Sequence, residues 1–148
     1  MSTEENKALM SRIYEVFNKK KLTALDELID PHAVDHSAPP GMPGGIEGAR
    51  QFAGMLLTAF PDLHFTVEDM IAEGNKVVAR LTMRGTQQGE FLGISPTGKH
   101  VTVTGIEIVY IVGGKIVEHW NNYDDLGLMQ QLGAIPPMSE GEVPSSPI

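Results

Sequence analysis

The chain has 148 residues, the length of one ordinary domain, and no apolar run approaches the roughly 20 residues that cross a bilayer. The absence of cysteine excludes disulfides, thiolate chemistry and cysteine-ligated zinc. A net charge of −8 argues against nucleic acid as a partner, because an acidic surface repels phosphates. The acidic amino-terminal segment lacks the apolar stretch of a signal peptide, so we expect a cytoplasmic protein without a membrane partner.

Two helices are predicted at the start of the chain. Ser2 can cap the first, with Glu5 completing a capping box, and an apolar stripe at helical spacing follows. The stripe consists of Leu9, Ile13, Val16 and Phe17. A short second helix carries Leu22, Leu25, Leu28 and Ile29, and it ends at Asp30-Pro31 because the residue before a proline leaves the helical region.

Residues 36–45 hold three prolines and three glycines, which excludes both a helix and a central strand there and predicts a loop of fixed shape. A third helix is predicted over residues 46–60, ending before Pro61. Four strands follow, at residues 65–71, 76–84, 101–112 and 115–123, with Gly113-Gly114 as a tight hairpin turn. Helices first and strands after predict an α+β fold, a curved antiparallel sheet with helices across one face.

We expect residues 1–135 to form a single domain and the Pro/Ser-rich residues 136–148 to form a poorly ordered tail. No internal repeat or nucleotide-binding motif is visible, since the glycine-rich stretch at residues 41–45 lacks the lysine of a phosphate loop and follows no strand.

The last hairpin brings candidate chemical groups together. If Val112 pairs with Lys115, Glu107 lies opposite Trp120 and side chains alternate between the two faces. One face then carries Val103, Gly105, Glu107, Val109, Glu118, Trp120, Asn122 and Asp124. The other carries Thr104, Ile106, Ile108, Tyr110, Val117, His119, Asn121 and Tyr123. Periodicity leaves open whether the first face meets solvent or lies under the helices.

Under the helices, a carboxylate of the first face would lose hydration, which raises its pKa and suits it to proton transfer. Trp120 would supply a flat apolar wall for a ring-shaped substrate. His36 suits either proton transfer or a loop anchor. His32 and His36 are four residues apart, but Pro31 argues against a helix there, so we expect no metal site.

Several segments together resemble the SnoaL-like polyketide cyclases, also called ester cyclases. They are residues 34–41, 59–62, 80–86 and 89–98, together with the most specific block, residues 114–133. The last block contains a Glu-x-Trp-x-x-x-Asp pattern at Glu118, Trp120 and Asp124. The resemblance spans residues 5–133 in order.

The resemblance implies a cone-shaped fold, shared with ketosteroid isomerase and scytalone dehydratase, in which helices pack over the concave face of a strongly curved mixed or antiparallel sheet around one pocket. It also implies that the face with Glu118, Trp120 and Asp124 lines that pocket. Characterised members close a ring by intramolecular aldol condensation without a metal or organic cofactor. By position, Asp124 would be the acid/base and His36 would donate a hydrogen bond to the enolate or alkoxide oxygen.

The remaining candidates for pocket walls and polar anchors are Tyr14, Phe17, Phe60, Arg80, Glu107 and Asn122. This chain departs from the family pattern at Gln87, where many relatives have histidine, and at Asn121-Asn122, which replaces a more usual acidic or apolar pair.

Two hypotheses follow. The first is a cofactor-independent acid/base enzyme acting on a small apolar carbonyl compound, a cyclase or a related isomerase or dehydratase. The second is a binding module that holds a hydrophobic ligand unchanged. In either case an apolar patch on the convex face predicts a homodimer or a tetramer. The patch comprises Ile106, Ile108, Tyr110, Val117 and Tyr123.

Overall fold

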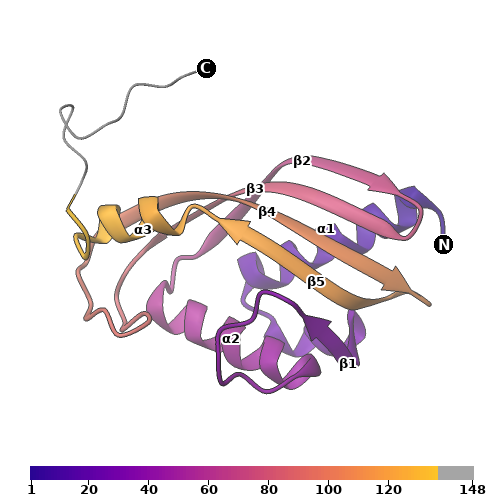
Figure 1. Ribbon diagram of the computed structural model, residues 1–148, viewed down its shortest axis with the longest axis horizontal. Coiled ribbons are helices and arrows are strands. Elements are labelled where there is room, and N and C mark those ends of the chain that lie inside the picture. Colours follow the sequence, from indigo (N-terminus) through magenta and orange to yellow (C-terminus); the bar gives the residue numbers. More distant parts are fainter. Residues whose placement is uncertain (137–148) are drawn as a thin grey trace.

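The computed structural model describes residues 1–136 and contains three α-helices, one 3-10 helix and five strands in that range. In chain order the elements are α1 (Thr3–Lys19), η1 (Leu22–Glu27), β1 (Ile29–Asp35), α2 (Gly45–Ala59), β2 (His64–Glu73), β3 (Lys76–Thr86), β4 (His100–Val112), β5 (Lys115–Tyr123) and α3 (Asp125–Leu132). Figure 1 shows their arrangement. Apart from residue 136, the predicted tail lies outside the described residues.

Helix α1 begins where its capping residues predict. The Ser2 side chain accepts a hydrogen bond from the Glu5 backbone N–H, and the Glu5 carboxylate accepts one from the Ser2 backbone N–H, each at 3.1 Å. The helix ends at Lys20, which adopts the left-handed conformation with φ 58°. One buried side chain on the helix, Asn6, has no hydrogen-bond partner for either amide atom among the described residues.

The segment after α1 differs from the sequence prediction. The expected second helix is only the 3-10 helix η1, and strand β1 follows it directly. The predicted helix end at Asp30-Pro31 is wrong: η1 ends at Glu27, and both residues lie inside β1. β1 is an edge strand, where a proline is tolerated because the outer N–H needs no partner. β1 lies parallel to β5, with Val34 opposite Glu118 and Asp35 opposite His119.

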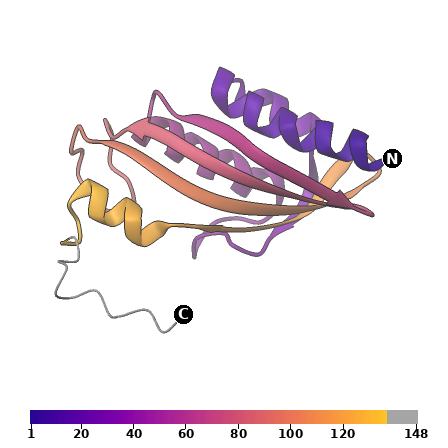
Figure 2. The same cartoon turned by 90° about the horizontal axis from the view of Figure 1, so that it is seen from above.

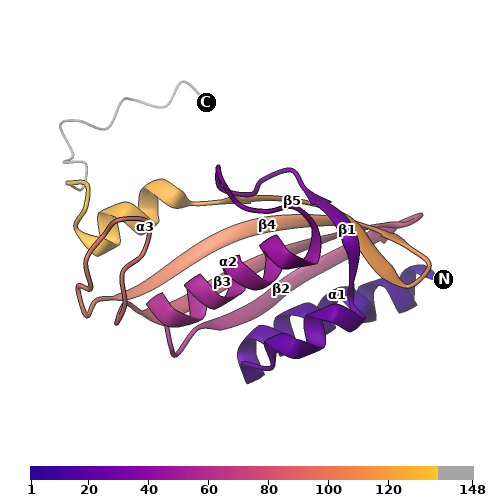
Figure 3. The same cartoon turned by 90° about the horizontal axis from the view of Figure 1, so that it is seen from below.

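The five strands form one mixed sheet in the order β1-β5-β4-β3-β2, parallel only between β1 and β5. Figures 2 and 3 show α1 and α2 on the same side of this curved sheet. The odd-numbered residues of β3 and β4 face these helices and form the core. They include Val77, Ala79, Leu81, Met83, Val101, Val103, Val109 and Ile111. The predicted α+β architecture, a curved mixed sheet with helices packed over its concave face, is confirmed.

The β4–β5 hairpin corrects the predicted register. Val112 pairs with Lys115 and Ile111 with Ile116, as predicted, but the register then shifts by one residue at a bulge. Beyond the bulge Glu107 lies opposite Asn121, and Ile108 lies opposite Trp120. Because side chains alternate along a strand, a shift of one residue moves every later β5 side chain to the other face.

Helix α3 was not predicted. It begins after Asp124 and ends at Gly133, which adopts φ 79°. Gln131 on this helix binds the free edge of β4, accepting from the Thr102 backbone N–H at 2.8 Å and donating to the Thr102 carbonyl at 2.9 Å. The helix therefore covers the edge of β4 beyond the end of β5, where β4 pairs only with β3.

Gln87, the departure from the family pattern, has a structural role. Its side chain is fully buried and donates to the carbonyls of Gly89 and Ile94. Its amide oxygen accepts hydrogen bonds from the Thr97 backbone N–H and hydroxyl. The amide thus holds both ends of the loop between β3 and β4 in place.

Candidate active site

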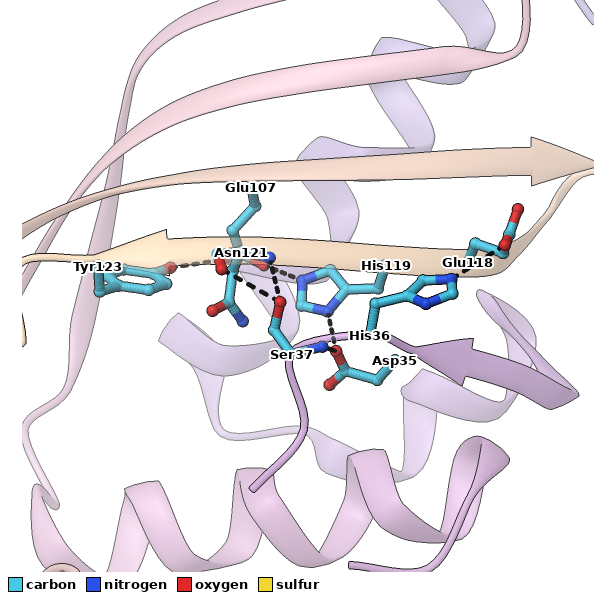
Figure 4. Close-up of polar contacts among 8 residues, drawn as sticks. All are labelled: Asp35, His36, Ser37, Glu107, Glu118, His119, Asn121 and Tyr123. Atoms are coloured by element: carbon cyan, nitrogen blue, oxygen red, sulfur yellow. Dashed lines mark hydrogen bonds and ion pairs between the residues drawn. The ribbon is translucent and has the colours of Figure 1, made fainter. Parts of the chain in front are cut away.

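A network of polar side chains lies in the middle of the sheet, on the face that the helices cover. Glu107 comes from β4, His119 and Tyr123 from β5, and Asp35 from the end of β1 (Figure 4). The register brings them together, because Val109 pairs with His119, Glu107 with Asn121 and Gly105 with Tyr123. Four groups from three strands therefore form one hydrogen-bonded chain.

His119 lies between two carboxylates. Its Nδ1 is 3.1 Å from Asp35 Oδ1 and its Nε2 is 2.5 Å from Glu107 Oε1. Burial would lower the pKa of His119, but the hydrogen bonds and charges of Asp35 and Glu107 raise it to about 10. The imidazole is therefore a cation at neutral pH.

Glu107 is surrounded by proton donors. Its second oxygen accepts a hydrogen bond from the Tyr123 hydroxyl, and its side chain is 13% exposed. Burial, followed by the negative charge of Glu107, raises the pKa of Tyr123 far above its ordinary value, and the same two causes raise that of Tyr14 on α1. Both hydroxyls stay protonated at neutral pH and remain hydrogen-bond donors.

Asp35 closes the network at its more exposed end. Burial raises the pKa of this carboxyl group, but the hydrogen bond and charge of His119 lower it more, so the net shift is downward. The carboxylate of Asp35 and the imidazolium of His119 therefore form an ion pair, and Glu107 contacts the same ring. Such a chain of groups can accept, hold and return a proton.

Three of the predicted pocket residues of β5 face the other way. Glu118, Trp120 and Asn122 lie opposite Tyr110, Ile108 and Ile106, on the face that the helices leave open. The prediction that their parity lines the pocket is wrong, because it assumed a regular hairpin and the bulge reverses the faces. The residues that reach the covered face are instead His119, Asn121 and Tyr123.

His36 belongs to the open face. Its ring stacks on Trp120 with centroids 4.7 Å apart and an interplanar angle of 9°, and its Nε2 is 3.0 Å from Glu118 Oε1. Lys76 Nζ lies 5.7 Å from the centroid of the Trp120 ring. These side chains interact with one another, on the opposite side of the sheet from Glu107.

Asp124 acts as a helix cap in this structure. Its Oδ1 accepts a hydrogen bond from the Gly127 backbone N–H at 3.0 Å, at the beginning of α3. A Cβ atom at Gly127 would overlap Asp124 Oδ2, so glycine leaves room for the carboxylate in this position. Whether Asp124 also moves a proton in catalysis remains a prediction.

The other predicted wall residues divide between the two faces. Tyr14 is buried and packs against Phe65, and Phe17 contacts the same ring edge-on. Phe60 is fully buried against Phe91. Arg80 is exposed and lies opposite Ile106 on the open face, so the prediction that it lines the pocket is wrong.

Two of the hollows on the surface of the described residues lie away from this network. One, of about 490 Å³, is lined by Gly54, Met55, Thr58, Glu90, Leu92 and Gly93. The other, of about 330 Å³, is lined by Met1, Glu5, Ala8, Leu9, Arg12, Glu27, Leu28 and Gly114. Neither touches Glu107 or His119, so neither is the pocket that the resemblance implies.

The sequence did not predict that His119, Asp35 and Tyr123 belong to one network. His119 and Tyr123 were assigned to the wrong face, and Asp35 precedes the singled-out His36 by one residue. The signal in the sequence was a histidine and a tyrosine on the same face of one strand, which pairs with the strand that carries Glu107.

In residues 1–136 no group of three His, Cys, Asp or Glu side chains is arranged to hold a metal ion.

Comparisons with known proteins agree with this fold. A family model described as SnoaL-like polyketide cyclase matches residues 7–132. Among solved structures, TsrD from Streptomyces laurentii superposes with a TM-score of 0.85 at 33% identity, covering 91% of this chain and 99% of that one.

Curated relatives are cyclases. The chain is 28% identical over 144 residues to the aklanonic acid methyl ester cyclase DauD of Streptomyces sp. (strain C5), covering 94% of this chain and 88% of that protein. It is 32% identical over 130 residues to the nogalonic acid methyl ester cyclase of Streptomyces nogalater, covering 84% and 95%. These matches confirm the predicted resemblance and the predicted cyclase-like class of enzyme.

Proposed function

This chain belongs to the SnoaL-like polyketide cyclases, and from that premise we propose that it closes a carbocyclic ring without a cofactor, with Glu107 as the acid/base group. The observation that supports Glu107 is its position. Its carboxylate lies under the helices and contacts His119 and Tyr123. Asp124, the base that the resemblance implies, instead caps α3, and His36 lies across the sheet.

The proposed reaction is an intramolecular aldol addition within a small apolar carbonyl compound. Glu107 takes a proton from the carbon next to one carbonyl group, and the resulting enolate carbon attacks a second carbonyl group of the same molecule. Glu107 then returns the proton to the alkoxide oxygen. Every atom of the substrate is kept, so the step needs no oxidant, reductant or organic cofactor.

The other groups of the network support this cycle. The imidazolium of His119 stabilises the ionised Glu107 between turnovers. The hydroxyls of Tyr14 and Tyr123 stay protonated and can donate hydrogen bonds to an oxygen that gains negative charge beside Glu107. Holding both carbonyl groups of one substrate in alignment supplies about 7–11 kcal/mol of the barrier reduction in favourable intramolecular reactions.

The methyl esters of aklanonic and nogalonic acid, which the relatives' names specify, are suitable test substrates. We expect the purified protein to convert at least one of them to a product of unchanged mass with one more ring, followed by liquid chromatography with mass detection. The rate should be the same in the presence of EDTA. A rate no higher than that of the uncatalysed reaction with both esters would contradict the proposal.

We also propose that the protein is a homodimer that pairs through the open face of the sheet. Ile106, Ile108 and Tyr110 lie on this face, as predicted, with Ile106 47% exposed. Trp120 joins them in place of Tyr123, which faces the helices. Burying such a patch between two copies would stabilise the pair.

Sedimentation velocity tests the dimer. We expect a species of twice the 16.1 kDa chain mass for the wild type and a monomer for Ile106→Glu. A wild-type monomer at micromolar concentration would contradict this proposal without affecting the assignment of Glu107.

No helix in residues 1–136 is both long and apolar enough to span a bilayer. We propose a cytoplasmic location.

A further inference from the structure

His119 is held between two carboxyl groups, one at each ring nitrogen. Asp35 Oδ1 lies 3.1 Å from Nδ1 and Glu107 Oε1 lies 2.5 Å from Nε2. An ionised carboxylate has no proton to donate, so each contact requires a proton on the ring nitrogen. Between two ionised carboxylates a neutral imidazole would turn one lone pair towards a carboxylate, so ionised partners at both nitrogens favour the imidazolium.

Asp35 is fixed in place by the main chain. Its Oδ1 also accepts the Ser37 backbone N–H at 2.9 Å, and the His36 backbone N–H donates to the His119 carbonyl at 2.9 Å. The Ser37 hydroxyl donates to the Asn121 carbonyl at 3.1 Å and accepts the Asn121 backbone N–H at 2.9 Å (Figure 4). Residues 35–37 thus continue the pairing of β1 with β5 and present the Asp35 carboxylate to His119.

We propose that Asp35 is a positioning residue of the active site, which holds the His119 imidazolium so that its Nε2–H faces Glu107. This inference rests on the proposed function, because it assumes that Glu107 is the group that exchanges the proton. Asp35 does not contact Glu107, and it acts through the ring between them.

Replacing Asp35 with an uncharged residue should change the pH at which His119 loses its proton. The charged and titratable groups around His119 are Asp35 from β1 and Glu107 from β4, with Tyr123 of β5 and Tyr14 of α1 next to Glu107 and His36 next to Asp35. Removing the charge of Asp35 leaves the imidazolium with one carboxylate in place of two. An opposite charge at this distance moves a pKa by about 1–3 units, so the ring should lose its proton at a lower pH.

The test compares Asp35→Asn with Asp30→Asn. In Asp35→Asn the side chain keeps an oxygen that can accept the Nδ1 proton but carries no charge. Asp30→Asn removes a charge from the same strand at a carboxylate that binds the His32 backbone N–H and does not contact His119. We expect the alkaline limb of the kcat/KM profile to move down by about 1–2 pH units in Asp35→Asn and to stay in place in Asp30→Asn. Superimposable profiles for Asp35→Asn and the wild type would overturn the proposal.

A second measurement separates this proposal from the proposed function. The His119 ring signals, assigned by their loss in His119→Gln, are titrated by NMR in the wild type and in Asp35→Asn. A downward shift of about 1–2 units in the variant supports the role of Asp35 even if neither methyl ester is turned over. Equal titration of His119 in both proteins would overturn it, whatever the activity.

Discussion

Glu107→Gln should lower kcat by about 10²–10⁴-fold, the contribution of a well-placed general acid/base group. The amide has nearly the same shape as the carboxylate and can still accept a hydrogen bond from His119 or Tyr123. It cannot take a proton from carbon at neutral pH. The loss should therefore appear in kcat, measured by conversion of the test substrate, while far-ultraviolet circular dichroism shows an intact fold.

The matched control is Asp124→Asn, because the family resemblance and the structure differ on this carboxylate. Asparagine caps a helix about as well as aspartate, so α3 should remain folded. If Glu107 is the base, Asp124→Asn turns over substrate at the wild-type rate. Loss of turnover in Asp124→Asn together with normal turnover in Glu107→Gln would mean that Asp124 is the base, and would contradict the proposed site.

Most elements of the fold were predictable because their signals are local. Ser2 and Glu5 determine the start of α1 within four residues of sequence, and Gly113-Gly114 determines the turn of the last hairpin. The alternation of buried and exposed residues in β3 and β4 predicts which side of those strands faces the core.

The faces of β5 were not predictable from the same rules. One additional residue at the bulge after Ile116 reverses every later side chain, and nothing in the local sequence, such as a glycine, marks it. Trp120 was therefore assigned to the covered face and His119 to the open one. The family resemblance did not correct the assignment of faces on β5, because it identified the pattern of residues and not the direction of their side chains.

Strand β1 is a second element that the sequence did not predict. Its partner β5 lies more than 80 residues later, and the pairing is parallel, so no turn between them gives a local signal. The contact of Asp35 with His119 depends wholly on that pairing. A site built from two strands that meet only in the folded protein is visible in the structure, although each of its residues looks ordinary in the sequence.

The free energy of unfolding should fall as the pH rises from 6.5 to 10, because of His119. Its pKa is about 10 in the folded protein and about 6.5 when unfolded, so between these values the folded state binds more protons than the unfolded state. The stabilisation is complete below pH 6.5 and is lost as the pH passes through 10. The slope approaches about 1.4 kcal/mol per pH unit, for a total of about 3–5 kcal/mol.

This total is a large part of the about 5–15 kcal/mol that stabilises a typical domain, so it can be measured by urea unfolding at a series of pH values. The control is His119→Gln, in which all other groups still titrate, and the difference between the two curves isolates the imidazole. Asp35 acts in the opposite direction: its lowered pKa adds stability at neutral pH that is lost as the pH falls below 3.8. Parallel curves for the wild type and His119→Gln between pH 6.5 and 10 would mean that the imidazole is not held as a cation. Glu107 and Asp35 would then lack the positive charge that keeps two carboxylates beside one ring.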